Sequence, residues 1–205
     1  MLVFALVNPA GAESAAPRTI VVLGDSLSAG YGLKIQEGWV NLLSRRLASE
    51  GYGYQVVNAS VSGETTQGGV ARLPRALALH KPEIVIIELG GNDGLRGLPL
   101  EASRDNLARA IELARGAKAR VLLVGMMIPP NYGQRYAQDF RDIFTTLATK
   151  YSVAFAPFLL DKVALHPELM QGDGIHANAK GQPQLLENVW FKLKPLLVAP
   201  RKPPS

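Results

Sequence analysis

The amino-acid sequence predicts an α/β sandwich built on a parallel sheet of five strands. Short apolar, β-branched runs alternate with longer segments of helical periodicity, and several of the runs end at glycine or small polar residues. Such alternation predicts a parallel sheet with helices connecting its strands. The chain has 205 residues, 47% hydrophobic and 19% charged, which fits one domain with a sizeable core.

The expected strands are short and apolar. The segment 83–89, EIVIIEL, is the most strand-like and leads directly into Gly90-Gly91. The other four expected strands span 19–23, 54–60, 120–127 and 153–158.

The expected helices lie between and after these strands, with apolar residues recurring every three or four positions. Their expected positions are a helix from Trp39 to Leu47 closed by Glu50-Gly51, then 69–79, 101–115, 136–150 and 185–193. Pro74 predicts a kink or a late start in the second helix, and Pro195 is expected to end the last one.

The first residues differ in character from the rest. Residues 1–12, MLVFALVNPAGA, carry no charged side chain and end in a small-residue triplet before Glu13. This pattern predicts the remnant of an export signal, although a basic leading segment is missing, and an ordinary N-terminal tail is the alternative. We expect a single domain over 13–205 in a periplasmic or secreted protein that, without cysteine, forms no disulfide.

Small and polar residues follow each predicted strand. They occupy the segments 24–30, 58–65, 90–94, 126–133 and 173–176. Because ligands of open parallel sheets bind outside the carboxyl ends of the strands, the sequence predicts a functional site along this edge.

Among three histidines, His176 is the best candidate for a general base. Asp173 lies three residues earlier and can accept from one ring nitrogen, leaving the other free. His166, which has no acidic partner nearby in the sequence, is the fallback base, whereas His80 fits a cap at a helix end. Ser26, in the turn after the first strand, is the candidate nucleophile. A serine hydroxyl is a weak nucleophile and needs a general base such as His176 to accept its proton.

Acyl transfer also needs hydrogen-bond donors where negative charge develops. The backbone N–H groups of Ser26 and Gly63 and the side-chain amide of Asn92 are candidates, although the glycines could serve only to shape turns. The G-x-S-x-G nucleophile elbow, the phosphate-binding P-loop and the dinucleotide fingerprint are absent, which disfavours those three classes of protein.

Two other functions stay open at this point. Candidate oxygen and nitrogen ligands would suit a metal-dependent phosphoesterase, although they are few for a two-metal site; they are Asp25, Asn92, Asp93, Asp173 and His176. The net charge of +5 would suit a protein that binds nucleic acid or an anionic membrane. Lysine and arginine are scattered through the helices, however, which favours an ordinary solvated surface. No apolar run approaches the 18 residues of a transmembrane helix.

Four separated blocks, GDSLSAGYG, NASVSGETT, GGNDGLRG and DGIH, together resemble the GDSL, or SGNH, hydrolases in order and spacing. The likeness covers most of the chain, from about Thr19 to Leu193. It implies a flavodoxin-like three-layer α/β/α sandwich and a serine esterase that needs no metal or cofactor. The implied catalytic triad is Ser26, His176 and Asp173, and the implied oxyanion hole is formed by Ser26, Gly63 and Asn92.

The resemblance also implies substrates of the acyl ester and thioester class, as in thioesterases, arylesterases and lysophospholipases. Expected substrate contacts are Asp25, Asp93, Ile128, Pro129 and Ile175, with the loop 93–99 helping to cover the acyl group. Ala177 replaces the proline of close relatives, which leaves the implied triad untouched. We expect a monomer that acts on small molecules, with no nucleic-acid partner and no stable membrane insertion.

Overall fold

The computed structural model describes residues 18–199, and the strands follow the predicted order. They are β1 (Arg18–Gly24), β2 (Tyr54–Asn58), β3 (Ile84–Glu88), β4 (Arg120–Val124) and β5 (Ala154–Ala156). All neighbouring pairs are parallel, in the order β2-β1-β3-β4-β5. This order is the flavodoxin-like one, so the predicted fold class is confirmed.

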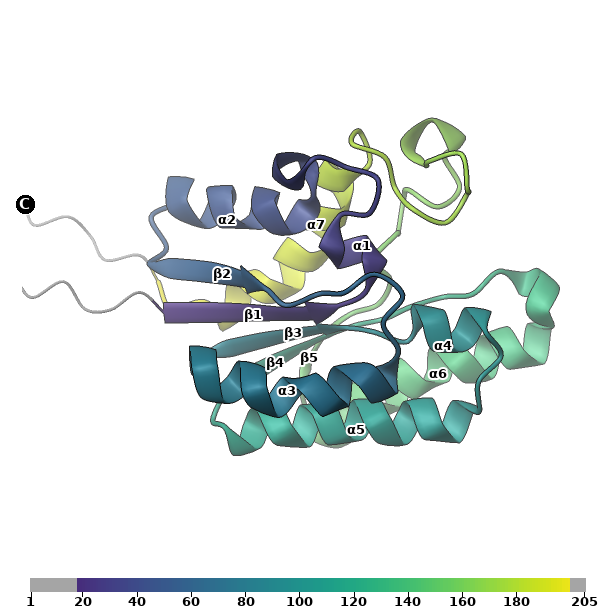
Figure 1. Ribbon diagram of the computed structural model, residues 1–205, viewed down its shortest axis with the longest axis horizontal. Coiled ribbons are helices and arrows are strands. Elements are labelled where there is room, and N and C mark those ends of the chain that lie inside the picture. The colour runs from purple at the N-terminus through teal and green to yellow at the C-terminus, as the bar shows by residue number, and fades with distance from the viewer. Residues whose placement is uncertain (1–17, 200–205) are drawn as a thin grey trace, which may run out of the picture.

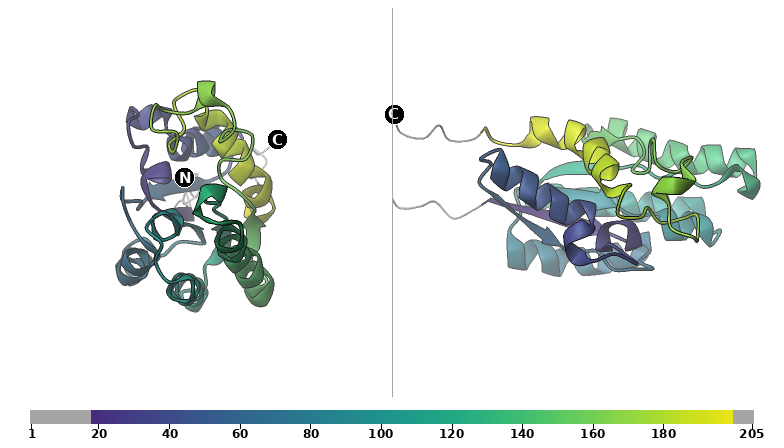
Figure 2. Two further views of the ribbon diagram at one scale, coloured as in Figure 1. Left: turned by 90° about the vertical axis from the view of Figure 1, so that its right-hand side faces the viewer. Right: turned by 90° about the horizontal axis from the view of Figure 1, so that it is seen from above.

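Helices cover both faces of the sheet (Figures 1 and 2). One face carries α2 (Trp39–Ser49) and α7 (Gln182–Leu193), and the other carries α3 (Thr66–His80), α5 (Leu100–Gly116) and α6 (Gln134–Tyr151). Within residues 18–199, no helix is both long and apolar enough to cross a membrane.

Each strand contributes side chains to two separate cores. In β3, Ile84 and Ile86 pack with α2 and α7, whereas Val85 and Ile87 pack with α3, α5 and α6. All four side chains have no solvent exposure. A strand buried on both faces needs apolar residues at successive positions, which explains why these strands are continuous apolar runs in the sequence.

Short helical turns connect the main elements. The two that bear on the site are α1 (Ser26–Ala29) and α4 (Gly91–Leu95), both in segments expected to be turns. The 3₁₀ turns are η1 (Ile35–Glu37), η2 (Pro130–Tyr132), η3 (Pro167–Leu169) and η4 (Lys194–Leu196). In Figure 1, α1 and α4 lie at the end of the sheet to which the strand arrows point.

The start of α3 is one place where the structure corrects the sequence prediction; β4 also ends three residues earlier than expected, at Val124, and α7 begins three residues earlier, at Gln182. The helix begins at Thr66, three residues before the expected start, and passes through Pro74. Thr65 caps it, because its hydroxyl accepts from the N–H of Gly68 at 3.3 Å. Gly69 lets the helix approach the sheet, since a Cβ there would lie 2.2 Å from Leu89 Cδ1. Glycine weakens a helix locally, and here tertiary packing outweighs that weakness.

Replacing Gly125 by alanine should destabilise the protein, because β4 ends in close contact with the backbone that follows β5. A Cβ at Gly125 would lie 2.2 Å from the carbonyl oxygen of Pro157. We expect Gly125→Ala to lower the free energy of unfolding by about 1–3 kcal/mol, measured by urea denaturation. Gly116→Ala is the control, because among residues 18–199 the added methyl would meet no atom within 4 Å outside its chain neighbours and the backbone of its own helix. Equal stabilities of the two variants would contradict the prediction.

Candidate active site

Ser26 stands at the first position of α1, directly after β1. Asp25 caps this short helix, because its Oδ1 accepts from the N–H of Leu27 at 3.0 Å. Gly30 ends it in the left-handed region at a φ of 78°. The sequence from Asp25 to Gly30 therefore builds one helical turn with the serine at its start, where backbone N–H groups have no partner within the helix.

His176 lies in a hairpin-like loop that follows β5. Met170 and Ala177 form an antiparallel bridge across this loop, and Gly174 turns it at a φ of 67°. Asp173 Oδ1 accepts from the N–H groups of Ile175 at 2.9 Å and His176 at 3.0 Å. The local spacing of Asp173 and His176 is thus fixed by the backbone of the turn that carries both.

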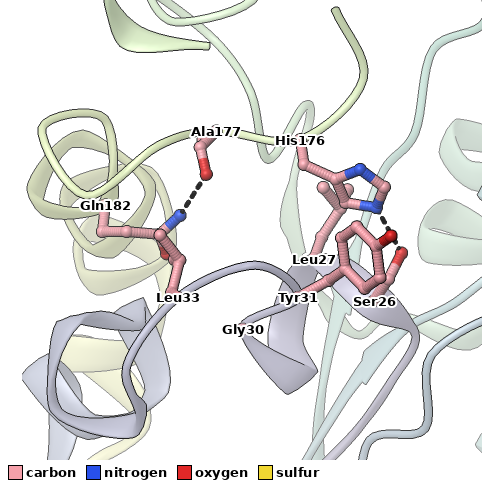
Figure 3. Close-up of a pocket in the computed structure, with 8 residues that line it drawn as sticks. All are labelled: Ser26, Leu27, Gly30, Tyr31, Leu33, His176, Ala177 and Gln182. Carbon is pink, nitrogen blue, oxygen red and sulfur yellow. Dashed lines mark hydrogen bonds between the residues drawn. The ribbon is translucent and has the colours of Figure 1, made fainter. Parts of the chain in front are cut away.

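The structure brings the three predicted residues of the triad into one hydrogen-bonded row. His176 Nε2 lies 2.8 Å from Ser26 Oγ (Figure 3). On the other side of the ring, His176 Nδ1 lies 2.6 Å from Asp173 Oδ2. A carboxylate at Nδ1 favours the tautomer whose Nε2 is free to accept a proton. The arrangement can therefore remove the proton of the Ser26 hydroxyl.

Asp173 is held in its ionised form. Partial burial opposes ionisation, but hydrogen bonds from the N–H groups of His176 and Ile175, and from the His176 ring, outweigh it and lower the pKa of Asp173 to about 2. A fixed negative charge therefore stands beside the ring, where it can stabilise a protonated imidazole.

Asn92 joins the loops that follow three strands. It lies in α4, after β3, and its Nδ2 donates to Asp25 Oδ2 at 3.2 Å and to the carbonyl of Glu64 at 2.9 Å. Asp25 belongs to the loop after β1 and Glu64 to the loop after β2. The amide thus lies between the nucleophile turn and the Gly63 loop, the two other segments that supply predicted oxyanion donors.

Gly63 adopts a backbone conformation that favours glycine, with a φ of 79°. Arg96 holds this turn by donating from Nη2 to the carbonyl of Gly63 at 3.1 Å. Among residues 18–199, the N–H groups of Ser26 and Gly63 have no hydrogen-bond acceptor. They are therefore available to a ligand oxygen.

Two acidic side chains lie buried beneath the nucleophile turn. Glu88, the last residue of β3, accepts hydrogen bonds from the Ser28 hydroxyl and, at 3.4 Å, from the N–H of Asp25. Burial raises the pKa of Glu88 well above its usual value, and the charge of Asp25 raises it further. Burial also raises the pKa of Asp25 to about 6, although the hydrogen bond from Leu27 opposes this. Glu88 Oε1 has no partner among the described residues.

The predicted substrate contacts fall into two groups. Asp25 and Asp93 are only 2% and 3% exposed, and their side chains accept hydrogen bonds from groups inside the protein. Asp93 accepts from the N–H and hydroxyl of Thr66 at 2.9 and 2.6 Å, which fixes the start of α3. Their contact with substrate stays a prediction, and the geometry gives them a role in holding neighbouring loops.

The apolar contacts differ among themselves in exposure. Ile128 is buried against Phe140 and Gly94 but also reaches an open groove along the start of α6. Pro129 and Ile175 are exposed. All three lie in loops at the site end of the sheet, and their contact with an acyl chain also stays a prediction.

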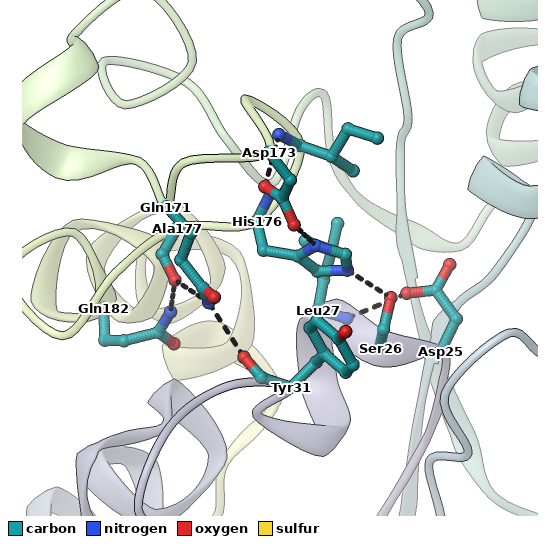
Figure 4. A network of polar contacts seen from close by, with 10 residues as sticks. Asp25, Ser26, Leu27, Tyr31, Gln171, Asp173, His176, Ala177 and Gln182 are labelled. Atoms are coloured by element: carbon teal, nitrogen blue, oxygen red, sulfur yellow. Dashed lines mark hydrogen bonds and ion pairs between the residues drawn. The ribbon is translucent and has the colours of Figure 1, made fainter.

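Several features of the site were not foreseen. The ring of Tyr31 packs on that of His176, with centroids 4.7 Å apart, and Gln171 braces the histidine loop (Figure 4). His166 does have an acidic partner, because its Nδ1 lies 3.1 Å from Glu168 on the exposed surface. His80 ends α3, as expected. Within residues 18–199, no three His, Asp or Glu side chains gather as a metal site would require.

A hydroxyl, an imidazole and a carboxylate in one row, beside free N–H donors, form the arrangement that serine hydrolases use. The chain matches the model of the GDSL-like lipase/acylhydrolase family over residues 22–183. It therefore belongs to this family and is an esterase, which confirms the resemblance seen in the sequence.

Individual relatives agree with this assignment. The chain is 52% identical over 185 residues to the esterase TesA of Pseudomonas aeruginosa, covering 90% of this chain and 92% of that protein. It is 42% identical over 185 residues to thioesterase 1/protease 1/lysophospholipase L1 of Escherichia coli K12. That match covers 90% of this chain and 88% of that protein. A crystal structure of TesA matches with a TM-score of 0.86, over 88% of this chain and 100% of that one.

Replacing Glu88 by glutamine should make stability less sensitive to alkaline pH. A raised pKa means that the folded state keeps a proton that the unfolded state loses, so this group lowers stability as pH rises above its ordinary value of about 4.5. Glutamine cannot ionise. We expect the Tm of Glu88→Gln, relative to that of the unmodified protein, to increase by about 3 °C or more between pH 5 and pH 9.

The exposed Glu101, in the first turn of α5, provides the control for this measurement. Glu101→Gln should show a difference in Tm that is nearly constant with pH. A flat difference for Glu88→Gln as well would show that Glu88 ionises as easily as an exposed carboxyl.

Proposed function

We propose that the protein hydrolyses small acyl esters and thioesters through an acyl-enzyme formed on Ser26. The observation that carries this proposal is the hydrogen-bonded row from Asp173 through His176 to Ser26, with contacts of 2.6 and 2.8 Å. A row of this geometry supplies both an activated nucleophile and a store for its proton.

Acylation begins when Ser26 Oγ attacks the carbonyl carbon of the substrate and His176 Nε2 takes the hydroxyl proton. The imidazolium that forms faces the Asp173 carboxylate, which stabilises it. The tetrahedral intermediate then breaks its bond to the alcohol or thiol, and His176 returns the proton to that leaving group. Water attacks the acyl-enzyme by the same route, releasing a carboxylic acid and free Ser26.

The negative oxygen of the tetrahedral intermediate would be bound by the N–H groups of Ser26 and Gly63 and by the amide of Asn92. In the free protein both hydrogens of Asn92 Nδ2 are already donated, to Asp25 and to Glu64. The oxyanion would therefore replace one of these acceptors, and the 3.2 Å bond to Asp25 is the longer of the two. The N–H groups of Ser26 and Gly63, which have no acceptor among residues 18–199, need little reorganisation when the charge develops.

We further propose that the enzyme acts as a monomer, because one chain supplies every group of this mechanism. Many of its basic side chains are paired on the surface, such as Arg18 and Arg120 with Glu83, which argues against a nucleic-acid partner. A periplasmic or secreted location is proposed from the apolar segment 1–12, which lies outside the described residues.

Ser26→Ala should abolish nearly all hydrolysis of p-nitrophenyl esters and acyl-CoA thioesters, because it removes the attacking oxygen. The thermal unfolding curve should stay close to that of the unmodified protein. A fluorophosphonate probe should label the unmodified protein at Ser26 and leave the variant unlabelled, and EDTA should leave the activity intact. Near-normal turnover by the variant, or complete loss with EDTA, would refute the proposed nucleophile.

Asn92→Ala should lower kcat by roughly 10²–10³-fold, as expected for the loss of one oxyanion donor, with a smaller change in KM. Steady-state kinetics on one p-nitrophenyl ester measures both constants. A change confined to KM would instead identify Asn92 as a residue that binds the substrate ground state.

A further inference from the structure

Gln171 links the nucleophile turn to the loop that carries the base. Its side-chain Nε2 donates to the carbonyl of Tyr31 at 2.8 Å and to the carbonyl of Ala177 at 3.2 Å. Tyr31 lies just beyond α1, and Ala177 directly follows His176. Both donor hydrogens of one amide are thus divided between two segments that are about 140 residues apart in the chain.

The backbone of Gln171 contacts the catalytic loop as well. Its N–H donates to the carbonyl of His176 at 2.7 Å, and its carbonyl accepts from the N–H of Gly174 at 3.0 Å. Gln171 therefore holds the main chain at the middle and at the far end of the turn that contains Asp173 and His176.

These contacts form a continuous path from the peptide of Ser26 to the peptide of His176. The N–H of Tyr31 donates to the carbonyl of Ser26 at 3.1 Å, the carbonyl of Tyr31 accepts from Gln171, and the N–H of Gln171 reaches the carbonyl of His176. The side-chain bond from Ser26 Oγ to His176 Nε2 closes this path into a ring (Figure 4). The length of that catalytic bond is thus tied to the position of the glutamine.

The local sequence leaves room for this side chain. Gly32 adopts a φ of 73°, and a Cβ there would lie 2.3 Å from Gln171 Oε1, so a larger residue would displace the amide. The ring of Tyr31 rests on that of His176, so the same link also positions the aromatic surface beside the base. Gln182 donates to the carbonyl of Ala177 at 3.1 Å and accepts from the N–H of Trp39 at 3.0 Å, so it ties the histidine loop to the start of α2 and not to Tyr31.

We propose that Gln171 is a positioning residue for catalysis, which sets the separation of Ser26 and His176 by joining Tyr31 to the histidine loop. This inference rests on the proposed roles of Ser26 and His176. Proton transfer between them depends steeply on geometry, and a displacement of about 1 Å can cost roughly 10²-fold in rate. Gln171 acts through the backbone and takes no proton itself.

Gln171→Met and Gln171→Glu test the link. Methionine has similar length without donors, and glutamate keeps the shape but turns a donor into an acceptor that faces two carbonyls. We expect each to lower kcat by roughly 10- to 100-fold, with KM changed by less than about twofold. If Gln171 served only for packing, the glutamate variant would keep a near-normal kcat, and that result would overturn the proposal.

Gln184→Met is the matched control, because Gln184 is also half-buried but, among residues 18–199, its side-chain amide hydrogen-bonds only to Asn188 within α7. It should retain kcat and KM. If Gln184→Met lowered kcat as much as Gln171→Met, the loss would be a general effect of removing an amide, and the proposal would fail. Thermal unfolding shows whether each variant is folded at the assay temperature.

A readout that needs no activity separates this proposal from the proposed function. The ring ¹³Cε1 signal of His176, followed by NMR, should shift in Gln171→Met while that of His80, at the end of α3, stays in place. Failure of the fluorophosphonate probe to label the unmodified protein would refute the proposed function alone. An unchanged His176 signal in Gln171→Met would overturn the role of Gln171 whatever the activity.

Discussion

The 2.8 Å contact between Ser26 Oγ and His176 Nε2 is the constraint on which the rest of the structure depends. Ser26 follows β1 and His176 lies beyond β5, with β3 and β4 between these strands in the sheet. A hydrogen bond tolerates only a few tenths of an ångström, so both loops need a rigid support. The parallel sheet provides it, because all five carboxyl ends meet at one edge and both faces are packed with apolar side chains.

A buried polar layer transmits that rigidity from the sheet to the loops. Glu88 holds the nucleophile turn, Asp93 holds the start of α3, and Asn92 connects the loops after β1, β2 and β3. Burying such groups costs several kcal/mol for each charge that remains unpaired. The protein limits this cost through the raised pKa of Glu88, which favours its neutral form, and by giving each oxygen of Asp93 a donor. The buried polar layer thus lowers the stability of the protein but fixes the geometry of the loops.

Much of this arrangement could be predicted from the sequence, for physical reasons that also explain the errors. The strands were found because burial on both faces demands continuous apolar runs, and Asp173 and His176 were paired because they share one turn. The start of α3 was missed because Asp93, a residue from another strand's loop, fixes Thr66. Glu88 left a visible signal, a carboxyl that follows four apolar residues within a strand. Gln171 left none, because it donates to backbone carbonyls that every residue has.

The three carboxyl groups around the site differ in pKa because their surroundings differ. Asp173 is partly exposed and accepts two backbone N–H bonds, so it is ionised beside His176. Glu88 is fully buried, which raises its pKa well above the usual value, and burial raises the pKa of Asp25 to about 6. In the proposed mechanism positive charge develops on the histidine and negative charge beside Asn92, which contacts Asp25. An ionised Asp25 would oppose the oxyanion, and its raised pKa reduces that opposition as the pH falls toward 6, while the low pKa of Asp173 supports the imidazolium. Differences in burial thus give the acids of the site different pKa values. The acid with the low pKa, Asp173, places negative charge where the reaction generates positive charge.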